Sequence, residues 1–104
     1  MAILVLDKPI TTEYVEVYNA ERSGSEIGKE FTLIGWGSYG TIGSSPRSLR
    51  DNKFHRGMNV FTKINDNELI YKMDKQRDGG LELEAIAYSG DSGGPAFIEV
   101  DSKL

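Results

Sequence analysis

One stretch of the sequence joins a serine in a glycine-rich loop to a short apolar run: Gly90-Asp91-Ser92-Gly93-Gly94-Pro95-Ala96-Phe97-Ile98-Glu99-Val100. Glycines on both sides of Ser92 allow backbone conformations that turn N–H groups toward one point. The run at residues 96–100 is short, apolar and β-branched, which predicts a strand. The sequence therefore places a serine hydroxyl group in a glycine-rich loop directly before a strand.

Two glycine patterns in the chain match motifs whose usual structural context is missing. Residues 90–94 fit Gly-x-Ser-x-Gly, which in α/β-hydrolases lies between a strand and a helix. Pro95 and the strand-like run after it exclude that helix. Residues 35–40 fit Gly-x-Gly-x-x-Gly, which binds a dinucleotide only when a helix follows at once. Residues 41–46 do not begin a helix, so we reject both interpretations.

The rest of the chain predicts an all-β fold, because no segment shows a helical period. We expect a buried strand at residues 2–6, a linker at 10–28 and further strands at 30–37, 52–64, 68–73 and 96–100. Residues 81–87 are expected to be extended or looped. Turns are expected at residues 65–67 and 78–80, where Asn, Asp and Gly cluster. Short strands separated by turns indicate a barrel or a sandwich.

Composition excludes several functional classes. The net charge of −4 argues against a nucleic-acid partner, and the basic group Lys53, His55 and Arg56 is interpreted as a solvated strand face. The chain has no cysteine, which excludes disulfides and thiolate metal sites, and we expect no metal and no cofactor. Residues 1–6 are too few for a signal peptide or a membrane span. The terminal Ser102-Lys103-Leu104 matches a peroxisomal address, but three residues match by chance often.

The motif Gly90-Asp91-Ser92-Gly93-Gly94-Pro95 resembles the nucleophile motif of the chymotrypsin/trypsin-like serine endopeptidases. Three further stretches agree with that family in order and spacing. Residues 2–9 resemble the strand after its catalytic aspartate, residues 33–37 its Gly-Trp-Gly strand, and residues 56–60 the next strand of cysteine-free bacterial-type members. The resemblance covers nearly the whole chain and implies a partial Greek-key β-barrel.

The resemblance also implies roles for individual residues. Ser92 is the expected nucleophile, and the backbone N–H groups of Gly90 and Ser92 are the expected oxyanion hole. Asp91 corresponds to the acid that pairs with the new N-terminus after zymogen cleavage. Ile86 lies near the base of the primary specificity pocket, where an aspartate would imply cleavage after Lys or Arg. Ile86 does not support that preference. The family suggests a secreted or periplasmic protein, and the compartment stays open.

The other two catalytic residues of the family have no counterpart in this sequence. The family order is His, Asp, Ser, and Met1 stands where the aspartate is expected. His55 is the only histidine, and nothing in the sequence brings it within ~3 Å of Ser92, so we expect a surface or cross-strand residue. We therefore expect one partial protease domain: residues 1–9 from the first barrel, 10–28 a linker and 29–104 a partial second barrel.

Three functional hypotheses follow from these observations. The first is a serine endopeptidase fragment that is inactive as a free chain and acts on peptide or protein substrate only with an N-terminal half. The second is a non-catalytic half-barrel that binds or complements another chain, or associates with itself through open strand edges. The third is an unrelated small all-β binding domain. None of them predicts a membrane or nucleic-acid partner.

Overall fold

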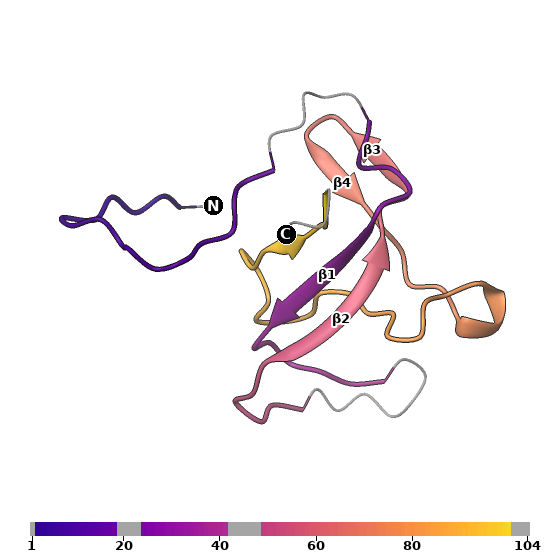
Figure 1. The fold of residues 1–104 in the computed structure, drawn as a ribbon. Helices are drawn as coiled ribbons and strands as arrows, with labels where there is room; N and C mark the ends of the chain where they lie inside the picture. Colours follow the sequence, from indigo (N-terminus) through magenta and orange to yellow (C-terminus); the bar gives the residue numbers. More distant parts are fainter. Residues whose placement is uncertain (1, 19–23, 42–48, 101–104) are drawn as a thin grey trace.

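The computed structural model describes residues 2–18, 24–41 and 49–100. In this part of the chain the strands are β1 (Glu30–Gly35), β2 (His55–Val60), β3 (Lys63–Asn65), β4 (Glu68–Ile70) and β5 (Ala96–Phe97), with one 3-10 turn, η1 (Gln76–Asp78). A three-stranded sheet has the order β2-β1-β5, and β3 pairs with β4 in a second sheet (Figure 1). The all-β prediction is confirmed.

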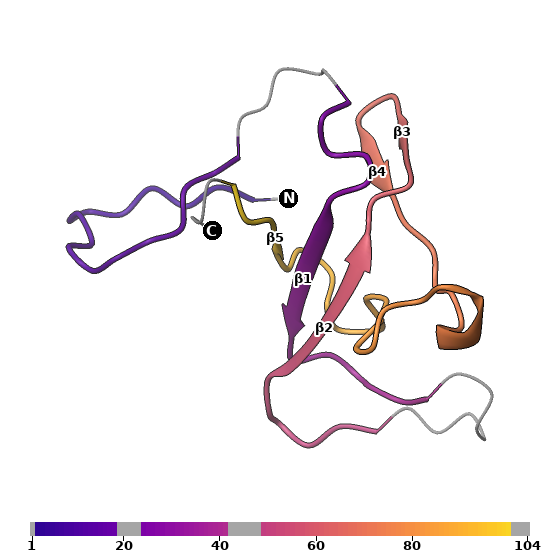
Figure 2. The same cartoon turned by 45° about the vertical axis from the view of Figure 1, so that its right-hand side comes forward.

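Side chains along β1 alternate between the two faces of the three-stranded sheet, and one of these faces packs against the rest of the protein. Phe31 is buried and Ile34 is exposed, as the period-two pattern predicts. β1 runs antiparallel to both neighbours (Figure 2). Phe31 on β1 pairs with Asn59 on β2. The ring of Phe31 stacks on Phe61 at 4.0 Å and meets Tyr71 edge-on at 4.9 Å. These three aromatic rings form the core, which suits a domain with so little buried surface.

The single strand predicted at residues 52–64 is two strands with a break at Phe61. The N–H of Phe61 donates to Lys29 O, and its carbonyl accepts from the N–H of Gly28. The next residue, Thr62, turns to the second sheet, where both its N–H and its hydroxyl donate to Ile70 O. The chain leaves one sheet for the other here because Phe61 is drawn into the core, where it is 5% exposed.

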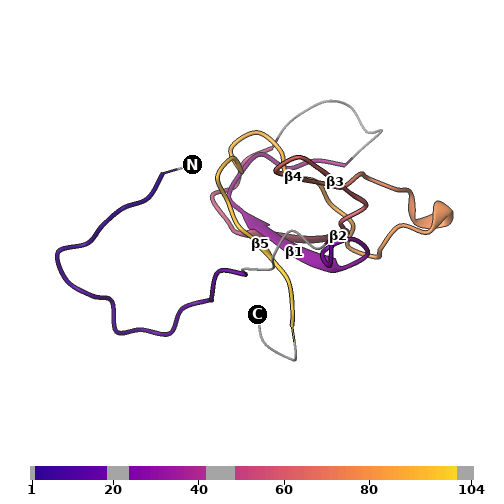
Figure 3. The ribbon, with the colours of Figure 1, turned by 90° about the horizontal axis from the view of Figure 1, so that it is seen from above.

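The β3–β4 hairpin lies across the body from the first sheet, as the view from above shows (Figure 3). Asn65 pairs with Glu68, so Asp66 and Asn67 form a two-residue loop. Asp66 has a positive φ of 49°, which Asp and Asn adopt at lower cost than other side chains. The turn predicted at residues 65–67 is therefore confirmed. The turn at 78–80 is also observed, as the end of η1 and its C-cap Gly79.

The buried strand predicted at residues 2–6 is wrong. Ile3, Leu4 and Val5 are 85%, 85% and 93% exposed, and residues 2–18 contain no strand. These residues form an extended arm, most of which lies apart from the sheets (Figure 1). A strand needs a partner for its N–H and C=O groups and a cover for its apolar side chains, and the described residues supply neither.

The remaining strands are shorter than predicted. β1 ends at Gly35, β4 at Ile70 and β5 at Phe97. Residues 81–87 are irregular, as predicted, apart from a parallel bridge between Met58 and Glu84. Met1, the middle of the loop at 42–48 and the terminal Ser-Lys-Leu lie outside the described residues. The division of the chain into a first-barrel segment (residues 1–9), a linker (10–28) and a partial second barrel (29–104) stays a prediction.

Candidate functional site

A cleft of about 720 Å³ opens beside Ser92. One wall is the inner face of β1 and β2, and the opposite side is formed by residues 84–88 and by the loop at 91–96. The hairpin and the segment after it contribute Leu69, Tyr71 and Met73. The cleft thus brings Ile86 and residues 91–95 of the motif together with His55, which is more than thirty positions earlier in the sequence.

Ser92 lies at the tip of its loop and is exposed to solvent. The turn is closed by the N–H of Gly94, which donates to Asp91 O at 2.9 Å. Gly90 has φ 101° and packs against Gly37, so that an added Cβ would lie 3.1 Å from Gly37 Cα. Within the described residues no acceptor receives the N–H of Gly90 or of Ser92. These two donors are therefore available to a ligand.

Asp91 fastens the serine loop to the end of β1. Its Oδ1 accepts the N–H of Gly37 at 2.7 Å, and its Oδ2 accepts the N–H of Tyr88 at 3.0 Å. The carboxylate occupies the space that a side chain at Gly35 or Gly37 would need, because a Cβ at either position would collide with it. The Gly-Trp-Gly segment and the Gly-Asp-Ser motif therefore form one packed unit. Asp91 makes no ion pair within the described residues, and its role in zymogen activation stays a prediction.

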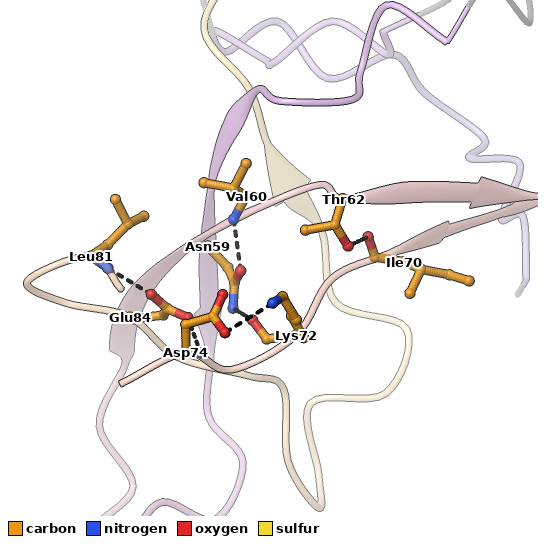
Figure 4. Close-up of polar contacts among 8 residues, drawn as sticks. All are labelled: Asn59, Val60, Thr62, Ile70, Lys72, Asp74, Leu81 and Glu84. Atoms are coloured by element: carbon orange, nitrogen blue, oxygen red, sulfur yellow. Dashed lines mark hydrogen bonds and ion pairs between the residues drawn. The ribbon is translucent and has the colours of Figure 1, made fainter. Parts of the chain in front are cut away.

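The wall that carries Ile86 is held in place by Asn59, which is 3% exposed. The side-chain amide of Asn59 donates to Lys72 O at 2.9 Å, and its oxygen accepts the N–H of Val60 (Figure 4). The same amide also donates to Ala85 O at 2.9 Å. Asn59 thereby joins β2 to both segments that flank the cleft. The sequence analysis missed this residue, because the strand predicted at residues 52–64 gave no sign of which side chains are buried; a buried polar group needs partners of this kind.

The adjoining loop at residues 74–84 is closed by Glu84. Its two carboxylate oxygens accept the N–H groups of Asp74 and Leu81, at 2.5 and 2.6 Å (Figure 4). Both Glu84 oxygens are bonded to backbone N–H groups, so Glu84 lines the cleft as a structural residue.

His55 on β2 pairs with Gly35 on the neighbouring strand β1, as a cross-strand residue. Its Nε2 pairs with Asp51 Oδ1 at 2.9 Å, and its ring stacks on Tyr39 at 4.3 Å. The hydrogen bond from His55 lowers the pKa of Asp51, with smaller help from the N–H of Lys53. Although His55 lines the same cleft as Ser92, neither residue hydrogen-bonds the other, and no described group accepts a hydrogen bond from the Ser92 hydroxyl.

The described residues contain no cluster of three or more His, Asp and Glu that could hold a metal ion. They also contain no helix long and apolar enough to cross a bilayer. Comparisons of the chain with protein-family models, with curated protein sequences and with solved structures each found no match. The resemblance to chymotrypsin-like enzymes therefore rests on the motifs quoted above.

Proposed function

We propose that this chain supplies the nucleophile and the oxyanion-binding groups of a serine endopeptidase site, within a partial Greek-key barrel of the chymotrypsin type. The observation that carries the proposal is the loop at residues 90–95. It exposes Ser92 at the edge of the cleft and leaves the N–H groups of Gly90 and Ser92 without acceptors in the described chain. Asp91 supports the same reading, because it fixes the loop to β1.

The chemistry proposed is acyl transfer to Ser92. The Ser92 oxygen bonds to the substrate carbonyl carbon while its proton passes to a base, and the carbonyl oxygen becomes an anion. The N–H groups of Gly90 and Ser92 donate to that anion, and one such donor contributes about 3 kcal/mol to transition-state stabilisation. The C–N bond then breaks, and the amine leaves with the proton. The described residues place no base at Ser92, so we expect the isolated chain to leave peptide bonds intact.

The test measures the reactivity of the Ser92 hydroxyl with and without an added base. A fluorophosphonate reacts when the Ser92 oxygen bonds to phosphorus, fluoride leaves, and a base takes the hydroxyl proton. We expect little reaction in buffer and a rate that rises with the concentration of free imidazole added as the base. Intact-protein and peptide mass spectrometry report the amount and the position of the adduct.

Two variants make the result specific. Ser92→Ala is expected to abolish the adduct. Ser89→Ala is the matched control, because Ser89 is exposed in the same loop and only its backbone carbonyl is bonded, to the N–H of Ser38. Equal labelling of Ser92→Ala and the unaltered chain would refute the nucleophile. Labelling without imidazole that still requires Ser92 would show that the chain contains its own base, and would refute the expected inactivity.

A second candidate function, a non-catalytic module that pairs with another chain or with itself, is favoured by one observation. The arm at residues 2–18 exposes Ile3, Leu4 and Val5, and β5 is an edge strand of the sheet. Exposed apolar strand-forming segments and open edges pair readily with other chains. Sedimentation over a hundredfold range of concentration is expected to show association that deletion of residues 2–6 removes. A monomer throughout that range would count against self-association.

A further inference from the structure

We propose that the cleft beside Ser92 takes a large apolar side chain, aromatic or branched aliphatic, and rejects both cationic and anionic side chains. The inference deepens the proposed function, because it names the class of peptide that the site would accept. The inference rests on the side chains that line the cleft and does not depend on the Ser92 hydroxyl.

The side chains that line the cleft on three sides are apolar or aromatic: Leu33, Leu69, Tyr71, Met73, Ile86 and Tyr88. Leu69, Met73 and Ile86 line the cleft and are 41%, 38% and 42% exposed, so each keeps apolar surface that a ligand can cover. A ligand side chain that covers this surface removes apolar area from water on both partners, at about 25 cal/mol for each Å². The cleft therefore favours a ligand group with a large apolar surface.

Both carboxylates that line the cleft are already occupied. Asp91 accepts the N–H groups of Gly37 and Tyr88, and Glu84 accepts those of Asp74 and Leu81. A lysine or arginine side chain would have to share these oxygens with the N–H groups, and would lose its hydration in the cleft. Neither acid therefore offers an unpaired carboxylate to a basic side chain.

The basic residues of the lining do not offer a site for an acidic side chain either. Nε2 of His55 is turned to Asp51, whose negative charge opposes a second carboxylate nearby. Arg56 pairs with Ile34, which is exposed on the outer face of the sheet, so strand alternation turns the Arg56 side chain away from the cleft. Neither basic residue of the lining therefore directs a free cation into the cleft. Arg50 lies outside the lining, near Gly90, and donates from Nε to Ser38 Oγ at 3.0 Å.

The apolar wall is held rigid before any ligand arrives. Ala85 is fixed through its carbonyl by Asn59, and Ala87 donates its N–H to the Tyr71 hydroxyl at 3.3 Å. Ala85 also packs directly over Gly57, where a side chain would collide with it. These contacts fix the backbone on both sides of Ile86, and a preformed wall loses little entropy when it binds.

The experiment is an NMR titration of the ¹⁵N-labelled chain with three small probes: the N-acetyl amides of phenylalanine, lysine and glutamate. We expect the phenylalanine probe to bind about tenfold or more tightly than either charged probe, with shifts centred on Met73, Ile86 and Tyr88. Ile86→Asp places a carboxylate in the wall and is expected to reverse the order, so that lysine binds about tenfold more tightly than phenylalanine. Leu83→Asp is the matched control, because Leu83 is 57% exposed and outside the cleft lining.

The outcomes distinguish this proposal from the proposed function. Three results would each overturn the proposed apolar preference of the cleft. They are binding of lysine or glutamate as tight as that of phenylalanine, no binding of any probe, and equal effects of Ile86→Asp and Leu83→Asp. The titration is repeated in Ser92→Ala, where the preference is expected to persist. If the preference for phenylalanine persists but Ser92 is not labelled in the presence of imidazole, the nucleophile is refuted and the cleft assignment stands. If Ser92 is labelled but the preference is absent, the cleft assignment is refuted and the nucleophile stands.

Discussion

Replacing Gly37 with alanine tests whether Asp91 ties the serine loop to β1. The N–H of Gly37 donates to Asp91 Oδ1 at 2.7 Å, Gly37 is buried, and an added Cβ would collide with the same carboxylate. Displacing the carboxylate loses a hydrogen bond to a charged group, about 1.5–3 kcal/mol. Overpacking adds about 1–3 kcal/mol. We therefore expect Gly37→Ala to lower the free energy of unfolding by about 3 kcal/mol, a large part of the about 5–15 kcal/mol typical of a domain.

A double-mutant cycle isolates the contact from other effects of the substitution. Asp91→Ala alone is expected to cost about 2 kcal/mol, because the buried N–H of Gly37 loses its acceptor. In the Asp91→Ala background the collision is gone, and Gly37→Ala is expected to cost less than about 1 kcal/mol, so the coupling energy is about 2 kcal/mol. Urea unfolding followed by far-UV circular dichroism measures all four proteins. Additive effects within about 0.5 kcal/mol would refute the proposed link between the two motifs.

Two further substitutions test the core and the ion pair beside the cleft. Phe31→Ala is expected to destabilise the fold by about 3–5 kcal/mol in urea unfolding, because Phe31 is 1% exposed and stacks on Phe61; a loss below about 1 kcal/mol would contradict this core. The hydrogen bond from His55 lowers the pKa of Asp51 in the folded state below its ordinary value of 3.8. The ionised Asp51 carboxylate therefore stabilises the folded state above pH 3.8. This stabilisation is lost as the pH falls through the lower pKa of the folded state. NMR titration of the Asp51 carboxyl group is expected to show its pKa moving up toward 3.8 in His55→Asn, and an unchanged pKa would contradict the assigned cause.

Local sequence signals predicted the features that depend on neighbouring residues. The run at residues 30–37 predicted a strand around Phe31, and Asn65-Asp66-Asn67 predicted the turn between β3 and β4. In both cases the cause is local, since side-chain alternation and turn conformations are decided within a few residues. The glycine loop before β5 was recognised for the same reason.

The features that the sequence analysis missed depend on contacts between distant segments. The strand breaks where the backbone partners change, from residues 28 and 29 at Phe61, more than thirty positions earlier, to Ile70 at Thr62. Asn59 holds Ala85 through a contact between residues 26 positions apart, which no local pattern encodes. The apolar run at residues 2–6 has the composition of a buried strand but no partner among the described residues, and burial requires a partner as well as composition.

The two roles assigned to Asp91 are compatible on hydrogen-bonding grounds. The resemblance assigns it an ion pair with a new N-terminus, whereas in this structure it accepts the N–H groups of Gly37 and Tyr88. An ionised carboxylate has about four lone-pair positions, so two remain after these bonds. An ammonium group can therefore bind Asp91 without releasing Gly37. Tyr88 is the contact that can be given up at lower cost, because it is exposed and water replaces the lost acceptor. Such an ion pair would rearrange residues 88–90, next to the N–H groups proposed to bind the oxyanion, while Gly37 keeps the loop on β1.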